Sequence, residues 1–241
     1  MDSRNALRGA AVATVLLALG GGRAQAHDDL PPAISQVAPS RPSRPMGPFQ
    51  VSLGLRSSLF RSTGYDPFST NDVFVQTGAM ATWALRTGGG FATAVGATWD
   101  SGSSSASARG PEASLSLRRL GGVIEERFAP RPWLYGFARV SPTWLHGSAT
   151  LQDVSVIGPL STTFDTLAVD GSLGAAACVP PRSSRITACA IADGGYGWAP
   201  TQHMALAPAL PASDRDKAGV TTLDDFAPRG AFYRLALALV F

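Results

Sequence analysis

Residues 233–241 read YRLALALVF, and their pattern indicates the fold class. Large apolar or aromatic residues fill every second position, with small or polar residues between them: Tyr233, Leu235, Leu237, Leu239 and Phe241 alternate with Arg234, Ala236, Ala238 and Val240. A two-residue period puts alternate side chains on opposite faces of a β-strand. At about 3.3 Å per residue and a tilt of about 40°, the stretch rises roughly 20 Å. It therefore predicts a tilted strand with one apolar face, close in height to the apolar band of a transmembrane barrel.

The same alternation recurs upstream and predicts eight strands, at about 49–60, 73–86, 91–100, 113–128, 133–149, 164–179, 186–198 and 230–241. Two of these strands lose phase, at Arg118-Arg119 and near Pro142, where we expect β-bulges. The connections alternate between short ones and long ones rich in Ser, Asp, Gly and Pro, the long ones being 61–72, 101–112, 150–163 and 199–229. This arrangement is typical of an up-and-down barrel with short turns at one end and long loops at the other.

The predicted fold class is therefore all-β, an eight-stranded antiparallel up-and-down transmembrane β-barrel over residues 49–241, although ten strands stay open. A soluble barrel of the lipocalin type would also have eight alternating strands. However, charged residues make up only 15% of the chain and fall mainly on the small or polar face of the strands. Aromatic residues gather near both strand ends: Phe49, Trp83, Phe91, Phe128, Trp133, Tyr135 and Phe241 near the short turns, and Phe60, Phe74, Trp99, Trp144, Tyr196, Trp198 and Tyr233 near the long loops. Charge inside, apolar groups outside and two aromatic girdles indicate a membrane barrel.

Residues 1–48 precede the barrel in two segments. In residues 1–26, Arg4 and Arg8 come before a short apolar run, and Ala24-Gln25-Ala26 has the small-x-small pattern of a cleavage site, which predicts a cleaved signal peptide. Residues 27–48 contain six prolines and few large apolar residues, and we expect a Pro-rich periplasmic tether. The chain holds a single lysine and no basic tract, which argues against a nucleic-acid partner.

The C-terminal stretch resembles the terminal β-signal of bacterial outer-membrane proteins, which ends in an aromatic residue preceded by alternating apolar residues. The matching positions are Tyr233, Leu235, Leu237, Leu239 and Phe241. Residues 49–241 as a whole are similar in organisation to the small outer-membrane barrels typified by the OmpA membrane domain and OmpX. The resemblance implies residence in the outer membrane of a Gram-negative bacterium, with outer-membrane lipid, periplasmic chaperones and the outer-membrane assembly machinery as partners.

Cys178 and Cys189 lie on either side of the turn at 180–185 and face each other on one predicted hairpin, about 5 Å apart in Cα. In an oxidising compartment we expect them to form a disulfide, with two unpaired buried cysteines as the alternative. No histidine lies nearby in this hairpin, so a metal site is not expected.

Several charged residues have the phase of the barrel interior: Arg56, Arg86, Arg139, Arg234, Asp100, Asp170, Asp193 and, as a further candidate, Glu125. These residues could line a narrow channel for small solutes. An eight-stranded barrel, however, is just wide enough to be filled by its own side chains, and buried arginines need carboxylate partners. We therefore expect a packed lumen closed by ion pairs.

His146 and Ser148 share one strand face near a long loop and faintly resemble the His-x-Ser of outer-membrane lipid A deacylases. No Asn follows Ser148, and only Asp153 or Asp165 could stand in for the acid of that family. We therefore expect no enzyme and no cofactor. The sequence favours a structural or surface-interaction role through the external loops, whose ligand it does not identify; a narrow channel and a lipid A-modifying enzyme remain the alternatives.

Overall fold

The structure, a computed structural model, describes residues 47–107, 112–131, 133–152, 159–179, 186–208 and 221–241. These residues belong to one compact unit. The expected signal peptide and nearly all of the expected tether lie outside the described residues. Within the described ranges, no helix has the length and apolar character needed to cross a membrane.

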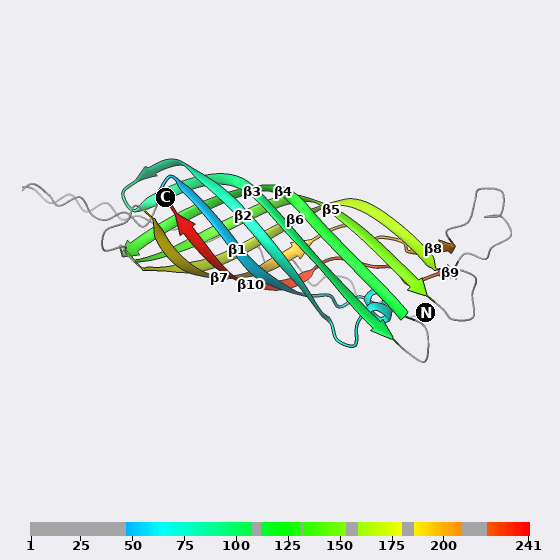
Figure 1. Cartoon of the computed structure of the whole chain (residues 1–241). Coiled ribbons are helices and arrows are strands. Elements are labelled where there is room, and N and C mark those ends of the chain that lie inside the picture. Colours follow the sequence, from blue (N-terminus) through cyan, green and yellow to red (C-terminus); the bar gives the residue numbers. More distant parts are fainter. Residues whose placement is uncertain (1–46, 108–111, 132, 153–158, 180–185, 209–220) are drawn as a thin grey trace, which may run out of the picture. The chain divides into compact units, whose positions relative to one another are not determined.

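The described chain consists almost entirely of strands joined in sequence order (Figure 1). One short 3-10 helix, η1, lies between the first two strands. The elements are β1 (Phe49–Leu59), η1 (Thr63–Phe68), β2 (Val73–Gly88), β3 (Phe91–Ser107), β4 (Glu112–Arg131), β5 (Leu134–Gln152), β6 (Leu160–Val179), β7 (Thr187–Trp198), β8 (Ala205–Pro208), β9 (Thr221–Thr222) and β10 (Gly230–Val240).

Eight strands close into a ring in the order β1 to β7 and then β10, each antiparallel to its neighbours. The ring closes where β1 pairs with β10, from Gln50↔Val240 to Ser58↔Phe232, and the two strands lie side by side in Figure 1. The predicted fold class is thus confirmed. The two remaining strands, β8 and β9, lie in the long connection expected as a loop, and β8 pairs with the start of β6.

Side chains alternate between the interior and the exterior of the ring along each strand, except at a register shift near the end of β2. On β10, Leu235 and Leu237 point outward and are 59% and 73% exposed, whereas Ala238 and Val240 are buried. The exposed large hydrophobic side chains of the other ring strands follow the same rule. An apolar exterior around a polar lumen suits a lipid surrounding, because lipid solvates apolar side chains but not charged ones.

Aromatic side chains mark both limits of this apolar surface. Near the short turns the outward ones include Trp83, Phe91, Phe128, Trp133 and Phe241, and near the long loops Trp99, Trp144, Tyr196, Trp198 and Tyr233. We call these sets the inner and the outer girdle. Three residues expected in the girdles point inward instead, because they have the lumen phase of their strands: Phe60, Phe74 and Tyr135.

The β-bulges expected at Arg118-Arg119 and near Pro142 do not occur. The registers of β3 with β4 and of β5 with β6 run without a shift through these positions. Arg118 is exposed and Arg119 is buried, in keeping with the alternation of the strand. The apparent loss of phase in the sequence has another cause, which is a change of polarity along each face. Beyond the outer girdle the inward positions become apolar, as at Leu115 and Leu117, and the outward positions become polar.

A register shift is present on β2 instead, between Ala84 and Arg86. It lies close to the turn that joins β2 to β3, where Gly89 and Gly90 adopt positive φ values of 58° and 83°. Two consecutive residues with positive φ match the right-handed twist of a tight hairpin, and glycine adopts this conformation without steric cost.

We expect Leu237→Arg to lower the free energy of unfolding by about 2–4 kcal/mol, because it places a charge midway between the girdles on the lipid side. Urea unfolding of the protein in lipid vesicles, followed by tryptophan fluorescence, measures the change. Ser103→Arg is the control, since Ser103 lies on β3 beyond the outer girdle and should tolerate the same side chain. Equal losses in both variants would contradict the assignment of the apolar surface to lipid.

Candidate functional site

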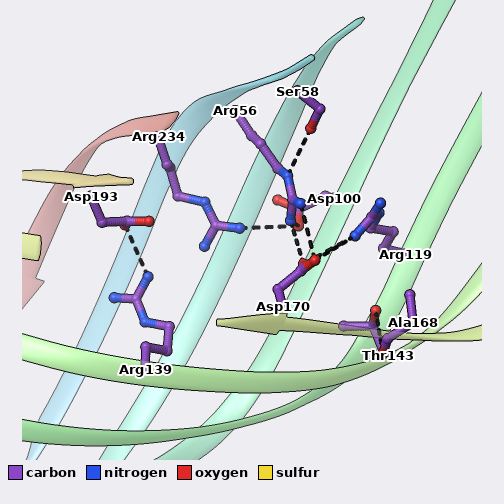
Figure 2. A network of polar contacts seen from close by, with 10 residues as sticks. All are labelled: Arg56, Ser58, Asp100, Arg119, Arg139, Thr143, Ala168, Asp170, Asp193 and Arg234. Atoms are coloured by element: carbon purple, nitrogen blue, oxygen red, sulfur yellow. Dashed lines mark hydrogen bonds and ion pairs between the residues drawn. The ribbon is translucent and has the colours of Figure 1, made fainter. Parts of the chain in front are cut away.

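The lumen holds a network of ion pairs contributed by most strands of the ring (Figure 2). Five arginines and four carboxylates of the described chain take part, all buried or nearly so: Arg56, Arg119, Arg127, Arg139, Arg234, Asp100, Glu125, Asp170 and Asp193. Side chains alternate between the two faces of each strand, and these charged side chains occupy the inward positions. The charges therefore face the lumen and not the lipid.

Asp170 on β6 is the acceptor for two arginines from distant strands. Arg119 of β4 donates through Nη1 to both of its carboxylate oxygens, at 2.9 and 3.0 Å. Arg56 of β1 donates through both terminal nitrogens, with Nη2 at 3.1 Å from Oδ1, and its Nε donates to Ser58 at 3.1 Å. The Arg56 guanidinium also lies 3.9 Å from the ring centroid of Phe232. A forked donor that meets a carboxylate in this way is fixed in both position and orientation.

Glu125 on β4 organises the second part of the network. Arg127 donates to its Oε1 at 2.5 Å, and Arg139 of β5 donates to its Oε2 at 2.7 Å. Arg139 continues to Asp193 of β7, with Nη1 and Oδ2 3.0 Å apart. Arg234 of β10, the register partner of Asp193, reaches Asp100 of β3 at 3.2 Å.

Several of these pairs join strands that are not neighbours in the ring. Arg56 links β1 to β6, and Arg234 links β10 to β3. Such bridges cross the lumen rather than follow its wall. Removal of one partner from a buried pair costs much more than the pair contributes, because the remaining charge is left uncompensated. The network therefore ties opposite walls of the barrel together.

Apolar clusters lie at both ends of the network. Toward the short turns, Tyr135, Phe137 and Ile191 pack with Cys178 and Cys189. Toward the long loops, a larger cluster combines inward residues of β2, β4, β5 and β6 with Phe60, which directly follows β1, and with residues of η1 and of the 199–229 connection. Its members are Phe60, Tyr65, Phe68, Phe74, Ala113, Leu115, Leu117, Leu145, Ala149, Phe164, Ala168, Ala199, Met204 and Phe226. We call this second cluster the outer core. The ion pairs are thus enclosed between two apolar layers.

Of the interior charges expected from the sequence, six lie in the lumen: Arg56, Arg139, Arg234, Asp100, Asp170 and Asp193. Arg86 does not. The register shift on β2 pairs it with Thr93, an outward position, and Arg86 is exposed. Glu125, the further candidate, does lie in the lumen. Arg119 and Arg127 were not expected in the lumen, although strict alternation along β4 would have identified both.

The two cysteines form a disulfide that joins β6 to β7 at the register pair Cys178↔Cys189, with their Cα atoms 4.0 Å apart. Both are buried in the apolar layer near the short turns. The five residues of the expected assembly signal all point outward on or directly after β10, which forms one side of the closing seam: Tyr233, Leu235, Leu237, Leu239 and Phe241. At the end of this seam, the Phe241 backbone NH donates to the Phe49 carbonyl at 2.8 Å.

His146 lies on the outer face of β5, two residues beyond Trp144 of the outer girdle. Its Nδ1 is 2.9 Å from Oδ1 of Asp165 on β6, and the Trp144 indole donates to the same oxygen at 2.9 Å. Ser148 has the same outward phase, but no described hydrogen bond joins it to His146. Asp153, the other acid considered, lies outside the described residues. Within the described ranges, no group of three or more potential metal ligands comes together.

Comparison with protein-family models and with curated proteins finds no match. Among solved structures, the chain is similar to Ail, the attachment invasion locus protein of Yersinia pestis, in complex with the heparin analogue sucrose octasulfate. The identity is 10% and the TM-score 0.44, over 80% of this chain and 98% of that chain. A major outer membrane protein from Thermus thermophilus gives 11% identity and a TM-score of 0.43, over 80% of this chain and 99% of that chain.

We expect Asp170→Asn to lower the free energy of unfolding by about 3–5 kcal/mol, because it leaves Arg56 and Arg119 without their shared carboxylate. Asp165→Asn is a matched control. It is the same substitution five residues away on the same strand, but on the outer, exposed face, and it should cause little change. Urea unfolding in lipid vesicles measures both. Equal stability of the two variants would show that the lumen pairs do not hold the barrel together.

Proposed function

We propose that this protein is an outer-membrane barrel with a closed lumen, which carries a folded β-sheet at the cell surface for a structural or surface-interaction role. The observation that supports this most is the continuation of β3, β4, β5 and β6 past the outer girdle. In register, Trp99 of β3 and Trp144 of β5 both oppose Leu120 of β4, and all three strands extend beyond this level. Strands that only spanned a membrane would not need this length.

The polarity of the side chains on this extension supports the proposal that the extension lies in water, beyond the membrane. Its outward side chains are polar and rich in hydroxyl groups, as at Ser103, Ser116, Ser148 and Thr163. Its inward side chains form the outer core, from which Leu115, Leu117 and Leu145 are fully buried. This arrangement is the reverse of that between the girdles. It is the arrangement of a sheet that has water on one face and a hydrophobic core on the other.

The long connections cover the outer core and thereby complete a folded unit. Phe60 makes edge-to-face contacts with Tyr65 of η1 at 5.4 Å and with Phe226 at 5.6 Å. Phe226 also meets Phe164 of β6 at 5.9 Å. The Ser104 hydroxyl on β3 donates to the Phe68 carbonyl at 2.8 Å. The described parts of these connections are therefore held in place and can present a defined surface to a partner.

A narrow channel is the first alternative, and the lumen network argues against it. The ion pairs cross the lumen and have apolar layers on both sides, so an ion would have to separate buried charge pairs to pass. We expect no stepwise conductance from the refolded protein in a planar lipid bilayer. Discrete conductance steps whose size changes in a folded lumen variant such as Arg56→Ala would establish a channel instead.

We also propose that the protein has no catalytic role at the outer leaflet. His146 is bonded to Asp165 as a catalytic histidine would be to its acid, but the nucleophile it would need is not hydrogen-bonded to it. Mass spectra of lipid A from cells that produce the wild-type protein or the His146→Ala variant should be identical. A modified lipid species present only with the wild-type protein would overturn this proposal.

Labelling of intact cells with a membrane-impermeant maleimide tests the proposed surface exposure. Ser105→Cys lies at an exposed position near the outer end of β3, and Thr87→Cys at an exposed position near the short turn after β2. The native cysteines are joined in a disulfide and should not react. We expect labelling of Ser105→Cys on whole cells and of Thr87→Cys only after lysis. Labelling of Thr87→Cys but not of Ser105→Cys on whole cells would mean that the barrel has the opposite orientation. If neither variant is labelled on whole cells, the proposed surface role is wrong.

A further inference from the structure

A pocket of about 650 Å³ lies at the outer end of β1, β7 and β10, away from the lumen network. Its strand residues Leu59, Tyr196 and Ala231 have the outward phase, so the pocket lies on the side of the barrel that faces lipid. The connections after β1 and before β10 provide the rest of the lining, including Arg61 and Arg229.

The pocket sits at the height where lipid headgroups begin. Tyr196 belongs to the outer girdle and pairs in register with Ala231, two residues beyond Tyr233 of the same girdle. Tyrosine side chains at this level mark the boundary between the acyl chains and the headgroups. The floor of the pocket is therefore apolar, and its opposite wall reaches into the headgroup layer.

Two guanidinium groups that have no partner among the described residues line that wall. Arg61 and Arg229 are exposed, and neither makes an ion pair or a side-chain hydrogen bond with any described residue. The acid that shares the pocket, Asp225, is already engaged, with its Oδ1 2.5 Å from Nδ1 of His203. Among its described residues the pocket thus has an excess of positive charge, unlike the lumen, where every arginine has a carboxylate.

The two arginines are held near each other by their backbones. Phe60 and Phe226, close to them in the chain, are in contact within the outer core. The Ser62 hydroxyl donates to the Asp225 carbonyl at 2.9 Å and accepts from the Ala227 backbone NH at 3.1 Å. Both segments are therefore ordered before any ligand arrives, which lowers the entropic cost of binding.

We propose that this pocket binds the phosphate of a phosphorylated outer-leaflet lipid, with Arg61 and Arg229 on the phosphate and the adjoining acyl chain against Leu59 and Ala231. Arginine suits this role because its planar fork pairs with two phosphate oxygens at once. The volume is within the range of sites that take a ligand the size of a phosphorylated sugar. The proposal rests on the proposed function only for the choice of the outer leaflet as the source of the lipid.

Binding to the full-length protein, refolded in a zwitterionic detergent, tests the proposal. Native mass spectrometry would follow the titration with bis-phosphorylated lipid A and with the same lipid after removal of both phosphates. We expect at least tenfold tighter binding of the phosphorylated lipid, and we expect Arg61→Gln/Arg229→Gln to abolish this preference. Arg86→Gln is the matched control. It removes the same charge from an exposed outward position at the other end of the barrel and should bind as the wild type does.

Further experiments distinguish a lipid-phosphate site from a site that only needs positive charge or that binds any anion. Arg61→Lys/Arg229→Lys keeps the charge but loses the fork, and it should bind with intermediate affinity. Inorganic phosphate at millimolar concentration should not displace the lipid; if it does, the pocket is a general anion site and the lipid source is wrong. Equal binding of both lipids, or an unchanged preference in the double Gln variant, overturns the proposal. The gel shift on heating verifies folding of each variant. Because binding in detergent does not depend on orientation, failure here is distinct from failure of the cell-labelling experiment.

Discussion

A strand in lipid must satisfy its backbone hydrogen bonds within the protein, and the architecture of the barrel follows from this requirement. No water is available in the hydrocarbon layer, so an open sheet edge would leave a row of unpaired amides and carbonyls. Pairing of β1 with β10 along almost their whole length removes both edges. Closure then determines the surroundings of each side chain between the girdles, because each strand has one face toward lipid and one toward a narrow lumen. Leu237 can face lipid and Arg234 cannot.

A narrow lumen that receives the charged side chains must also neutralise them. The eight-stranded ring lets arginines reach carboxylates on non-neighbouring strands, as Arg56 reaches Asp170. The same inward face changes character above the outer girdle, where water replaces lipid outside. There the inside becomes the apolar outer core and the outside becomes polar. The same strands thus pass from lipid into water. The polarity of each face reverses at the outer girdle, whereas the inward and outward alternation of side chains continues unchanged.

The arginines of this protein fall into two kinds that differ in burial and in pairing. Arg119 and Arg139 are buried and paired, and they join walls of the barrel. Arg61 and Arg229 lie at the boundary of lipid and water on a shared pocket and have no described partner. The closed lumen and the folded outer sheet are the basis of our proposal that this protein contacts other molecules through its exterior rather than its interior. The pocket lined by Arg61 and Arg229 and the hydroxyl-rich outward face of β3 to β6 are the two surfaces that we propose for such contacts.

The sequence alone was enough to predict the two-residue period of most strands, the number of strands in the ring, the short connections and the pairing of Cys178 with Cys189. These features are local, since they follow from alternation within a strand or from the symmetry of one hairpin. Two of the expected long connections, 101–112 and 150–163, were too long, because β3 continues to Ser107, β4 begins at Glu112 and β6 begins at Leu160. The closed ring was needed to establish which charges meet across the lumen, why Arg86 turns outward and why β4 needs no bulge at Arg119. Contacts across a ring depend on its closure and on the register of every strand between the partners. The reversal of polarity at the outer girdle depends on the height of each residue in the membrane, which cannot be read from the sequence alone.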